Sequence, residues 1–239
     1  MFKKLIINRR EVYHKTNACI YWIDQYDSFR SFRMKEEEIL DLLNRNSIIS
    51  RDGHFRYTSG KHGSEYFRKD IIYSHTRLTS RLCYEIMRRV SNIYGDGMFV
   101  PQAVIGPAIG GVILSQWIAY HFSEFYKLDT PALYADKSDG EFVIKRGYED
   151  IVKDKQVLVV EDVVNTGGSL IKLIEAVSGA GGNVICAGII CNRGNITKEE
   201  LGIPNLVSLL DFPMHSWTAD ECPLCSKGIG LNKSLGHGV

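Results

Sequence analysis

The sequence predicts an α/β fold in which helices flank a mostly parallel central sheet. Short apolar runs such as VLVV and VICAGII alternate with segments of helical periodicity, as in chains where each strand is followed by a helix. These runs do not alternate apolar with polar residues, which is typical of parallel strands buried on both faces. With 239 residues, of which 44% are hydrophobic, the chain is long enough for one such domain with small additions.

The expected elements follow one another in a regular order. The segment MKEEEILDLLNRN, residues 34–46, begins a helix, because acidic residues crowd its first turn, where the helix dipole favours them. A polar and aromatic stretch follows over residues 54–72. The remaining prediction is a helix over 76–90, a strand over 103–106, a helix over 112–122, strands over 132–135, 142–145 and 156–161, a helix over 169–178, and strands over 184–191 and 206–210.

The chain divides into an extension and one domain. Residues 1–33 are rich in aromatic residues and arginine but have no clean period. We expect them to be an accessory or poorly ordered extension, with a partner-binding segment as the alternative. Residues 34–239 are expected to form the domain, with a core over about 76–212 and a cysteine-containing tail over 213–239.

Charge and hydropathy favour a small-molecule partner in the cytoplasm. The 29 basic and 28 acidic residues give a net charge of +1, so no excess of positive charge is available for nucleic acid or an anionic membrane surface. No stretch approaches the roughly 18 uncharged apolar residues of a membrane-spanning helix. The first residues, MFKKLIINRREVYH, lack the sustained apolar region of a secretory signal.

The cysteines are expected to be reduced thiols rather than a disulfide framework, because the chain is large enough to fold without cross-links. They are Cys19, Cys83, Cys186, Cys191, Cys222 and Cys225. With His215 and His237, the pair Cys222 and Cys225 offers a Cys₂His₂ zinc site as an alternative, but the histidines are too widely spaced for a zinc finger. We therefore expect no metal bound directly by protein side chains.

The segment VLVVEDVVNTGGSLIKLIEAV predicts a phosphate site. In a parallel sheet, ligands bind beyond the carboxyl ends of the strands, and Glu161 and Asp162 lie at such an end. The turn at residues 166–169 then exposes backbone N–H groups at a helix N-terminus, which binds phosphate. The glycine spacing is neither that of a dinucleotide-binding turn nor that of a Walker loop.

Adjacent acids beside a phosphate site indicate a sugar phosphate. The carboxylates of Glu161 and Asp162 can accept hydrogen bonds from the vicinal hydroxyls of a ribose. Their negative charge would also favour an oxocarbenium-like transition state at the anomeric carbon. The alternative is that the two acids only end a strand and that the glycines shape an ordinary turn.

An apolar strand, two acids, two apolar residues and a Thr-Gly turn resemble the signature of the type I phosphoribosyltransferases. The resemblance implies that the chain has the fold of that family and binds phosphoribosyl pyrophosphate (PRPP). It implies substrate contacts from Glu161, Asp162, Val163, Val164, Asn165, Thr166, Gly167, Gly168 and Ser169. In AVIGPAIGGVILSQWIAYHF, the pyrophosphate loop of the family is matched by Ala108, Ile109, Gly110 and Gly111. Mg²⁺ would be carried by PRPP and water rather than by a dedicated motif.

Within that superfamily the resemblance is greatest to the orotate phosphoribosyltransferases. It covers GHFRYTSGKHGSEYF, PALYADK, IKRGY and the tail ECPLC, from Met34 to about Lys227. It implies a hood over the base from residues 34–75, and a homodimer. Lys137 would contact the pyrophosphate from a mobile loop at 136–146 and act in catalysis with Glu161 and Asp162. Arg193 would bind the orotate carboxylate, which suits a guanidinium.

Three positions depart from the pattern of that family. Asn165 replaces a threonine that touches the base, Asn192 replaces the aspartate before the arginine, and the loop at 138–141 lacks an additional lysine and histidine. Two alternatives follow: the same chemistry on another nucleobase, or a regulator of the same fold that senses PRPP without catalysis. The intact acid pair favours an enzyme.

Overall fold

The structure is a computed structural model that describes residues 33–57, 59–93 and 99–235. The extension expected over residues 1–33 lies, apart from its last residue, outside the described residues, as does His237. Within the described ranges, no helix has both the length and the apolar character needed to cross a membrane.

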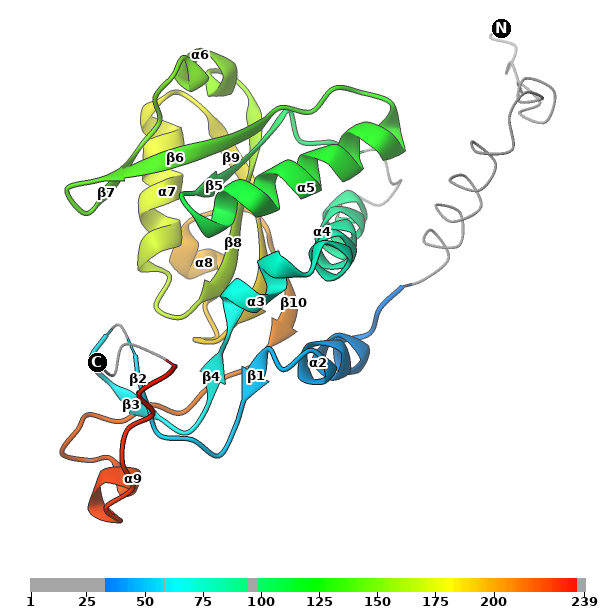
Figure 1. Ribbon diagram of the computed structural model, residues 1–239. Coiled ribbons are helices and arrows are strands. Elements are labelled where there is room, and N and C mark those ends of the chain that lie inside the picture. The colour runs from blue at the N-terminus through cyan, green and yellow to red at the C-terminus, as the bar shows by residue number, and fades with distance from the viewer. Residues whose placement is uncertain (1–32, 58, 94–98, 236–239) are drawn as a thin grey trace, which may run out of the picture. The chain divides into compact units, whose positions relative to one another are not determined.

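A central sheet of six strands organises the core (Figure 1). The strands are Ala103–Pro107 (β5), Ala132–Ser138 (β6), Glu141–Val143 (β7), Gln156–Val164 (β8), Asn183–Asn192 (β9) and Leu206–Asp211 (β10). Their order is β10-β9-β8-β5-β6-β7, in which all neighbours pair in parallel except the antiparallel edge pair β6 and β7. The predicted α/β class with a mostly parallel sheet is confirmed.

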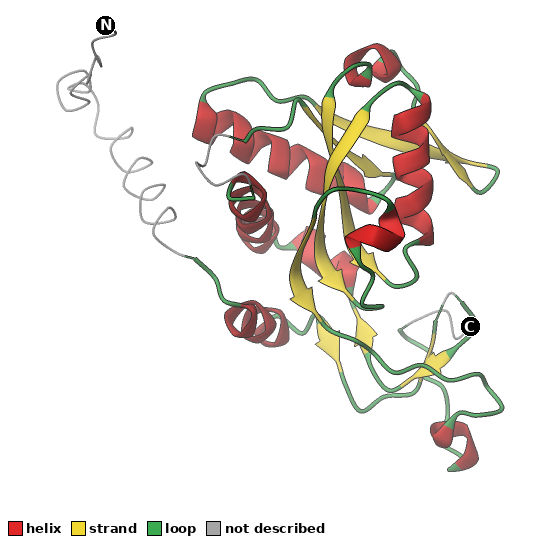
Figure 2. Cartoon of the chain, turned by 180° about the vertical axis from the view of Figure 1, so that it is seen from behind, coloured by secondary structure: helices red, strands yellow, loops and turns green. Residues whose placement is uncertain are grey.

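Helices cover both faces of the sheet. Thr76–Ser91 (α4) and Gly110–Tyr126 (α5) pack on one face, and Gly168–Gly179 (α7) and Lys198–Leu201 (α8) lie on the other (Figures 1 and 2). Tyr148–Val152 (α6) connects the β7 edge to β8. The order of elements is therefore the strand-to-helix alternation that the sequence predicts.

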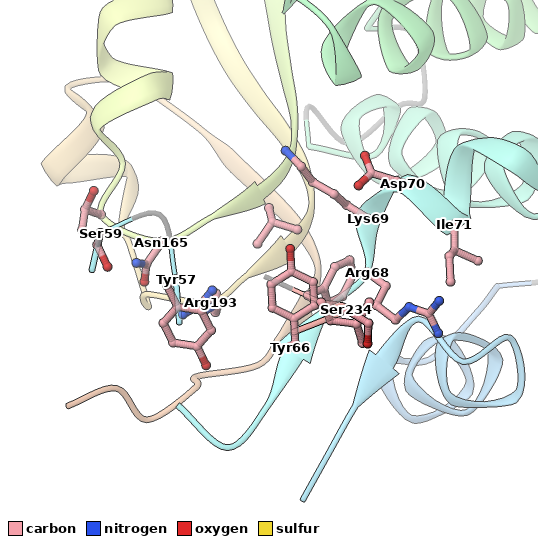
Figure 3. A pocket seen from close by; sticks show the side chains of 14 residues that line it. Tyr57, Ser59, Tyr66, Arg68, Lys69, Asp70, Ile71, Asn165, Arg193 and Ser234 are labelled. Atoms are coloured by element: carbon pink, nitrogen blue, oxygen red, sulfur yellow. The ribbon is translucent and has the colours of Figure 1, made fainter. Parts of the chain in front are cut away.

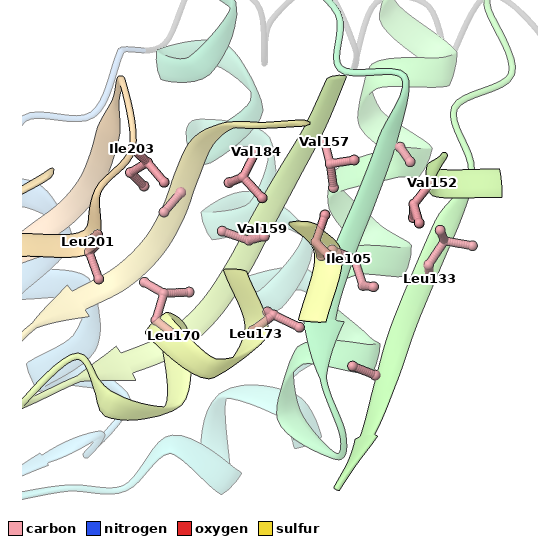
Figure 4. Close-up of a cluster of buried hydrophobic side chains, with 14 of the residues drawn as sticks. Ile105, Leu133, Val152, Val157, Val159, Leu170, Leu173, Val184, Leu201 and Ile203 are labelled. Atoms are coloured by element: carbon pink, nitrogen blue, oxygen red, sulfur yellow. The ribbon is translucent and has the colours of Figure 1, made fainter. Parts of the chain in front are cut away.

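The hydrophobic core explains why the strand segments read as continuous apolar runs. Six consecutive residues of β8, from Val157 to Asp162, are buried, and nine of the ten β9 residues are buried. On the α7 face, side chains of the sheet meet those of the covering helices, as with Val159 and Leu173 (Figure 4). This packing fixes the carboxyl ends of the central strands, where the acids emerge.

The hood is built from short elements before the core. Its helices are Glu36–Arg45 (α2) and Lys69–Ser74 (α3). Ile49–Ser50 (β1) pairs with Tyr66–Phe67 (β4), and Phe55–Arg56 (β2) pairs with His62–Gly63 (β3), both antiparallel. The tail, residues 213–239, contains Pro223–Ser226 (α9) and returns to the hood, where Trp217 and His62 exchange backbone hydrogen bonds of 2.9 and 2.8 Å. The carboxyl-terminal tail is thus paired with the segment that was expected to form the hood.

The connection expected as a loop over residues 136–146 is largely a β-hairpin instead. β6 continues to Ser138, and β7 begins at Glu141, so the turn is Asp139-Gly140. Both turn residues have positive φ, 51° and 84°, as a type I′ hairpin turn requires. Lys172 of α7 donates a 2.7 Å hydrogen bond to the Gly140 carbonyl and pairs with Glu141 at 2.7 Å.

Candidate active site

The predicted acid pair lies inside β8, near its carboxyl end, rather than after the strand. Asp162 is only 1% exposed and Glu161 8%. The carboxylate of Asp162 accepts hydrogen bonds from the Tyr73 hydroxyl at 2.5 Å, from Lys69 Nζ at 3.3 Å and from the backbone N–H of Val163 at 2.7 Å. Helix α3 of the hood therefore contacts the acid pair directly.

The electrostatics of this cluster favour an added positive charge. Burial, together with the charge of Asp162, raises the pKa of Glu161 above its ordinary value. Burial lowers the pKa of Lys69, but the two carboxylates together raise it by more, so its ammonium stays charged. Burial and then Asp162 raise the pKa of Tyr73, which keeps its hydroxyl a donor. One lysine thus compensates two adjacent acids only in part.

The turn after β8 forms the expected helix N-terminus. Gly167 has φ +77°, a left-handed conformation that glycine adopts without strain. Thr166, Gly168 and Ser169 are exposed there, and α7 begins at Gly168. The first N–H groups of a helix have no partner within it. The structure therefore places the predicted phosphate turn three residues beyond the acid pair, open to a ligand.

The glycine loop between β5 and α5 lies against the acid pair. A Cβ atom at Gly110 would fall 2.5 Å from Asp162 Oδ2 and 2.5 Å from the Tyr73 hydroxyl, so only glycine allows this approach. Ile109 beside it is 82% exposed, and the peptide bond between Ala108 and Ile109 is cis. Gly110 thus brings the loop at residues 108–111 close to Asp162.

A cavity of about 830 Å³ opens between the hood, the core and the tail (Figure 3). The core lines it with residues at or just after the carboxyl ends of β8 and β9, and the hood lines it with aromatic and charged side chains. The lining consists of Tyr57, Ser59 and Tyr66–Ile71 from the hood, Val163, Asn165, Thr166 and Arg193 from the core, and Ser234 and Leu235 from the tail. It therefore joins Lys69 and the phosphate turn to the region around Arg193.

Arg193 is held in this cavity with an unused donor. Its guanidinium carbon lies 3.9 Å from the centre of the Tyr57 ring, and the Tyr57 hydroxyl donates a 2.6 Å hydrogen bond to the Glu65 carbonyl. Among the described residues, the buried Nε of Arg193 has no hydrogen-bond partner. A buried donor without a partner is costly, so an acceptor from a ligand would complete the site.

Asn192 serves the local backbone. Its side-chain amide donates to the Ile196 carbonyl at 2.9 Å and accepts from the Ile196 N–H at 3.0 Å. It thereby closes the turn that follows Arg193. Gly194 allows the same turn to pack against Asn165, because a side chain at Gly194 would overlap the Asn165 carbonyl.

Some site residues were not predicted, and one predicted residue lies elsewhere. Lys69, Tyr73 and Tyr57 were read only as part of a polar and aromatic hood, because no local motif marks them. Lys137 is exposed on β6 and is not among the residues that line the cavity. Its proposed contact with pyrophosphate is therefore not part of the geometry of this structure.

The cysteines of the tail also have different neighbours from those considered in the sequence. His215 is exposed, whereas Cys222 and Cys225 lie beside His54 and His62 of the hood. The two histidines precede the cysteines by at least 160 residues, so no short spacing motif joins them.

Comparison with known proteins adds independent observations. The Phosphoribosyl transferase domain matches residues 76–221. The orotate phosphoribosyltransferase of Desulforamulus reducens is 35% identical over 196 residues, which cover 82% of this chain and 94% of that protein. That of Caldanaerobacter subterraneus subsp. tengcongensis is 35% identical over 200 residues, 84% of this chain and 97% of that protein.

Solved structures agree in fold. The crystal structure of orotate phosphoribosyltransferase from Aeropyrum pernix aligns with a TM-score of 0.54 and 26% identity, over 71% of this chain and 91% of that one. The Mycobacterium tuberculosis orotate phosphoribosyltransferase in complex with 5-phospho-alpha-D-ribosyl 1-diphosphate aligns with a TM-score of 0.52 and 20% identity, over 72% of this chain and 93% of that one.

Proposed function

The chain belongs to the phosphoribosyltransferase family, on the branch of the orotate phosphoribosyltransferases, and we propose that it transfers phosphoribosyl from PRPP to orotate. A bond forms between N1 of orotate and the anomeric carbon as the bond from that carbon to pyrophosphate breaks, and the N1 proton leaves with the pyrophosphate, giving orotidine 5′-monophosphate. The observation that carries this proposal is the buried, unpartnered Nε of Arg193, among the described residues, in the same cavity as Lys69 and Thr166.

The Arg193 end of the cavity suits a planar acid. A guanidinium binds a carboxylate through two parallel hydrogen bonds, and the Tyr57 ring below Arg193 holds the guanidinium plane in place. Tyr66 from the hood lines the same space (Figure 3). Orotate carries a carboxylate on a flat ring. The carboxylate suits the charged donor Arg193, and the ring suits a space lined by Tyr57 and Tyr66.

The core end of the cavity suits the sugar phosphate. We assign the 5′-phosphate to residues 165–169, where exposed N–H groups open α7. Glu161 and Asp162 are assigned to the ribose hydroxyls, and residues 108–111 to the pyrophosphate. Lys69, which already pairs with Asp162 at 3.3 Å, lies where the departing pyrophosphate gains negative charge.

Catalysis in this proposal comes from position and charge. The partly compensated acid pair stabilises positive charge at the anomeric carbon, while Lys69, and Lys137 from the β6–β7 hairpin, stabilise the leaving group. No side chain forms a covalent intermediate. The hood covers the base side of the cavity and limits the access of water, which would otherwise compete with N1.

Mg²⁺ is the proposed cofactor, carried by PRPP and water. Asp162 already accepts hydrogen bonds from Tyr73, Lys69 and Val163, and Glu161 is almost fully buried, so the pair does not form a carboxylate cage. Mg²⁺ keeps several waters and needs few protein ligands, so this donor set fits an ion bound mainly through the substrate. When bound, the ion neutralises pyrophosphate charge.

We also propose that the protein acts in the cytoplasm as a homodimer. The described cysteines are free thiols, as expected in a reducing compartment, and two-fold dimers are the commonest soluble oligomers. Light scattering on the purified chain tests the oligomeric state.

A turnover screen tests the substrate. The chain is incubated with PRPP, Mg²⁺ and each of orotate, uracil, hypoxanthine, guanine, xanthine and adenine, and pyrophosphate release is measured. We expect turnover with orotate alone. Turnover with another base would favour the second candidate, for which Asn165 in the cavity lining is the supporting observation. PRPP binding by calorimetry without any turnover would instead indicate a sensor.

A further inference from the structure

Four potential metal ligands from distant parts of the chain converge where the tail meets the hood. They are His54, His62, Cys222 and Cys225, and their ligand atoms all lie within 4.8 Å of one another. The first three are buried, and Cys225 is exposed at the surface. None of them lines the substrate cavity, so this cluster is separate from the proposed chemistry.

Four of the six ligand-atom separations lie near the edges of a tetrahedron around one ion, and the other two are at most 4.8 Å. His54 Nε2 lies 3.0 Å from His62 Nδ1, 3.5 Å from Cys222 Sγ and 3.6 Å from Cys225 Sγ. Cys225 Sγ lies 3.2 Å from His62 Nδ1. Tetrahedral Zn²⁺ with Zn–N near 2.0–2.1 Å and Zn–S near 2.3 Å requires ligand separations of roughly 3.3–3.8 Å. The observed distances fall close to that range.

Hydrogen bonding among these groups does not satisfy them without a cation. His54 Nδ1 lies 2.6 Å from the Ile229 carbonyl, which can only accept, so Nδ1 is the donor in this contact and, in the neutral ring, Nε2 presents a lone pair. One imidazole nitrogen and two thiols then face that single lone pair, and only one of them can donate to it well. A cation would instead accept electron pairs from all four.

The contact between His54 Nδ1 and the Ile229 carbonyl is also typical of histidines that bind a metal through their other ring nitrogen. Such histidines nearly always donate their second ring N–H to a carbonyl or carboxylate, which fixes the tautomer and the ring orientation. Ile229 belongs to the tail segment just after the two cysteines, and its own N–H donates to the Leu224 carbonyl at 3.0 Å. The tail therefore supplies two candidate ligands and the group that orients a third.

Local structure holds both halves of the cluster in position. The register of the β2–β3 hairpin pairs Phe55 with Gly63 and Arg56 with His62, which places His54 and His62 diagonally on one face. On the tail side, the turn of α9 brings Cys222 and Cys225 together. Backbone hydrogen bonds from His62 to Trp217 and from Asn232 to His54 join the two halves.

We propose that His54, His62, Cys222 and Cys225 bind one Zn²⁺ ion in a closed, structural site that fastens the tail to the hood. Two thiolates with two imidazoles in tetrahedral geometry favour zinc among the common divalent ions. Four protein ligands leave no open position, so the ion supports the fold and does not activate water. Because Tyr57 and Ser234 on either side of the junction line the substrate cavity, the ion also fixes one wall of the base site.

Metal content tests the site directly. The untagged full chain is equilibrated with zinc and freed of loosely bound metal by gel filtration. Its zinc content is then measured by inductively coupled plasma mass spectrometry. We expect one zinc per chain, lost in His54→Ala and Cys225→Ser. The variants His215→Ala and His237→Ala are matched controls that should retain zinc. Absence of zinc from the wild type, or its loss in the controls but not in His54→Ala, would overturn the proposal.

Cobalt substitution tests the ligands without relying on the stability of a variant. Co²⁺ bound to the wild type should give the intense visible bands of a tetrahedral site together with thiolate-to-metal charge transfer. Cys225→His should keep the tetrahedral bands with about half of the charge-transfer intensity, because one of two thiolates is removed. An octahedral spectrum in the wild type, or undiminished charge transfer in Cys225→His, contradicts the site. Neither measurement involves turnover, so its outcome is distinct from that of the substrate screen.

Discussion

The two sides of the substrate cavity are stabilised in different ways. The core side rests on β8 and β9, strands of nine and ten residues buried at the centre of a six-stranded sheet. The hood side rests on two-residue strands in two separate pairs. Isolated two-stranded pairs are marginal in water, so the hood depends on contacts with other parts of the chain.

The two sides of the cavity therefore have different roles in the proposed reaction. The acid pair and the phosphate turn are fixed by the main core and are held in position before substrate binds. The base site depends on Arg193 against Tyr57, on the tail and on the proposed zinc ion. Changes at the acid pair should therefore affect turnover, while changes where Arg193 meets Tyr57 should affect the binding of the base.

Replacement of Asp162 by asparagine should have the largest effect and should be confined to chemistry. Asp162→Asn keeps the size of the side chain but removes the charge that would face the developing positive charge, so turnover should fall by at least about 100-fold. Circular dichroism and zinc content should be unchanged. Turnover near that of the wild type would remove the acid pair from the reaction.

Replacement of Arg193 should instead act on one substrate. Arg193→Ala removes hydrogen bonds to a charged group, each of about 1.5–3 kcal/mol, so the KM for orotate should rise roughly 10- to 100-fold while that for PRPP changes little. Arg193→Lys is the matched control: it keeps the charge but loses the planar fork, and should recover only part of the affinity. Equal changes in both KM values would place Arg193 outside the base site.

The two sides also differ in how far the sequence predicts them. Glu161 to Ser169 form a strand, a turn and a helix start within one continuous segment, so local pattern predicted their arrangement. Lys69 and Tyr73 reach Asp162 across 93 and 89 residues, and His54 reaches Cys222 across 168. Such contacts depend on how the hood and tail pack, which periodicity and short motifs do not encode.

One local signal was present but was not used. Asp139-Gly140 is a dipeptide typical of type I′ hairpin turns, yet residues 136–146 were predicted as a loop between two strands. In the structure, the positive φ angles of these two residues close the β6–β7 hairpin. Whether that hairpin moves on binding substrate stays a prediction.

Lys137 offers a test of that hairpin, with a moderate expected effect. Lys137→Ala should lower turnover roughly 10-fold while PRPP binding survives, because its charge is needed where pyrophosphate departs. Hydrogen exchange over residues 136–146 should slow when PRPP and Mg²⁺ bind. Lys172→Ala, which removes the bonds to Gly140 and Glu141, should speed exchange in the free protein. Unchanged turnover and exchange would make Lys137 an ordinary surface lysine.

The smallest expected effect is on the pH dependence of stability, and it concerns Glu161 of the acid pair. Burial, then the charge of Asp162, raises the pKa of Glu161 above its ordinary value near 4.5. The folded state therefore holds the proton more tightly than the unfolded state, so this group favours folding at acid pH and that contribution is lost as pH rises above the ordinary value. Glu161→Gln removes the titration and keeps the neutral form.

The melting temperature of Glu161→Gln should accordingly match that of the wild type near pH 4.5 and exceed it increasingly up to pH 8. A difference of roughly 2–4 °C would correspond to about 1 kcal/mol for a domain of this size. Glu175→Gln, on the exposed face of α7, is the control and should show no such divergence. Glu161→Gln should nonetheless have low turnover. The negative charge of Glu161, which is unfavourable in the free protein, is the charge that stabilises the transition state. If the melting temperature of Glu161→Gln instead fell relative to that of the wild type as pH rises, the free protein would stabilise the Glu161 carboxylate. Its negative charge would then be compensated without bound substrate.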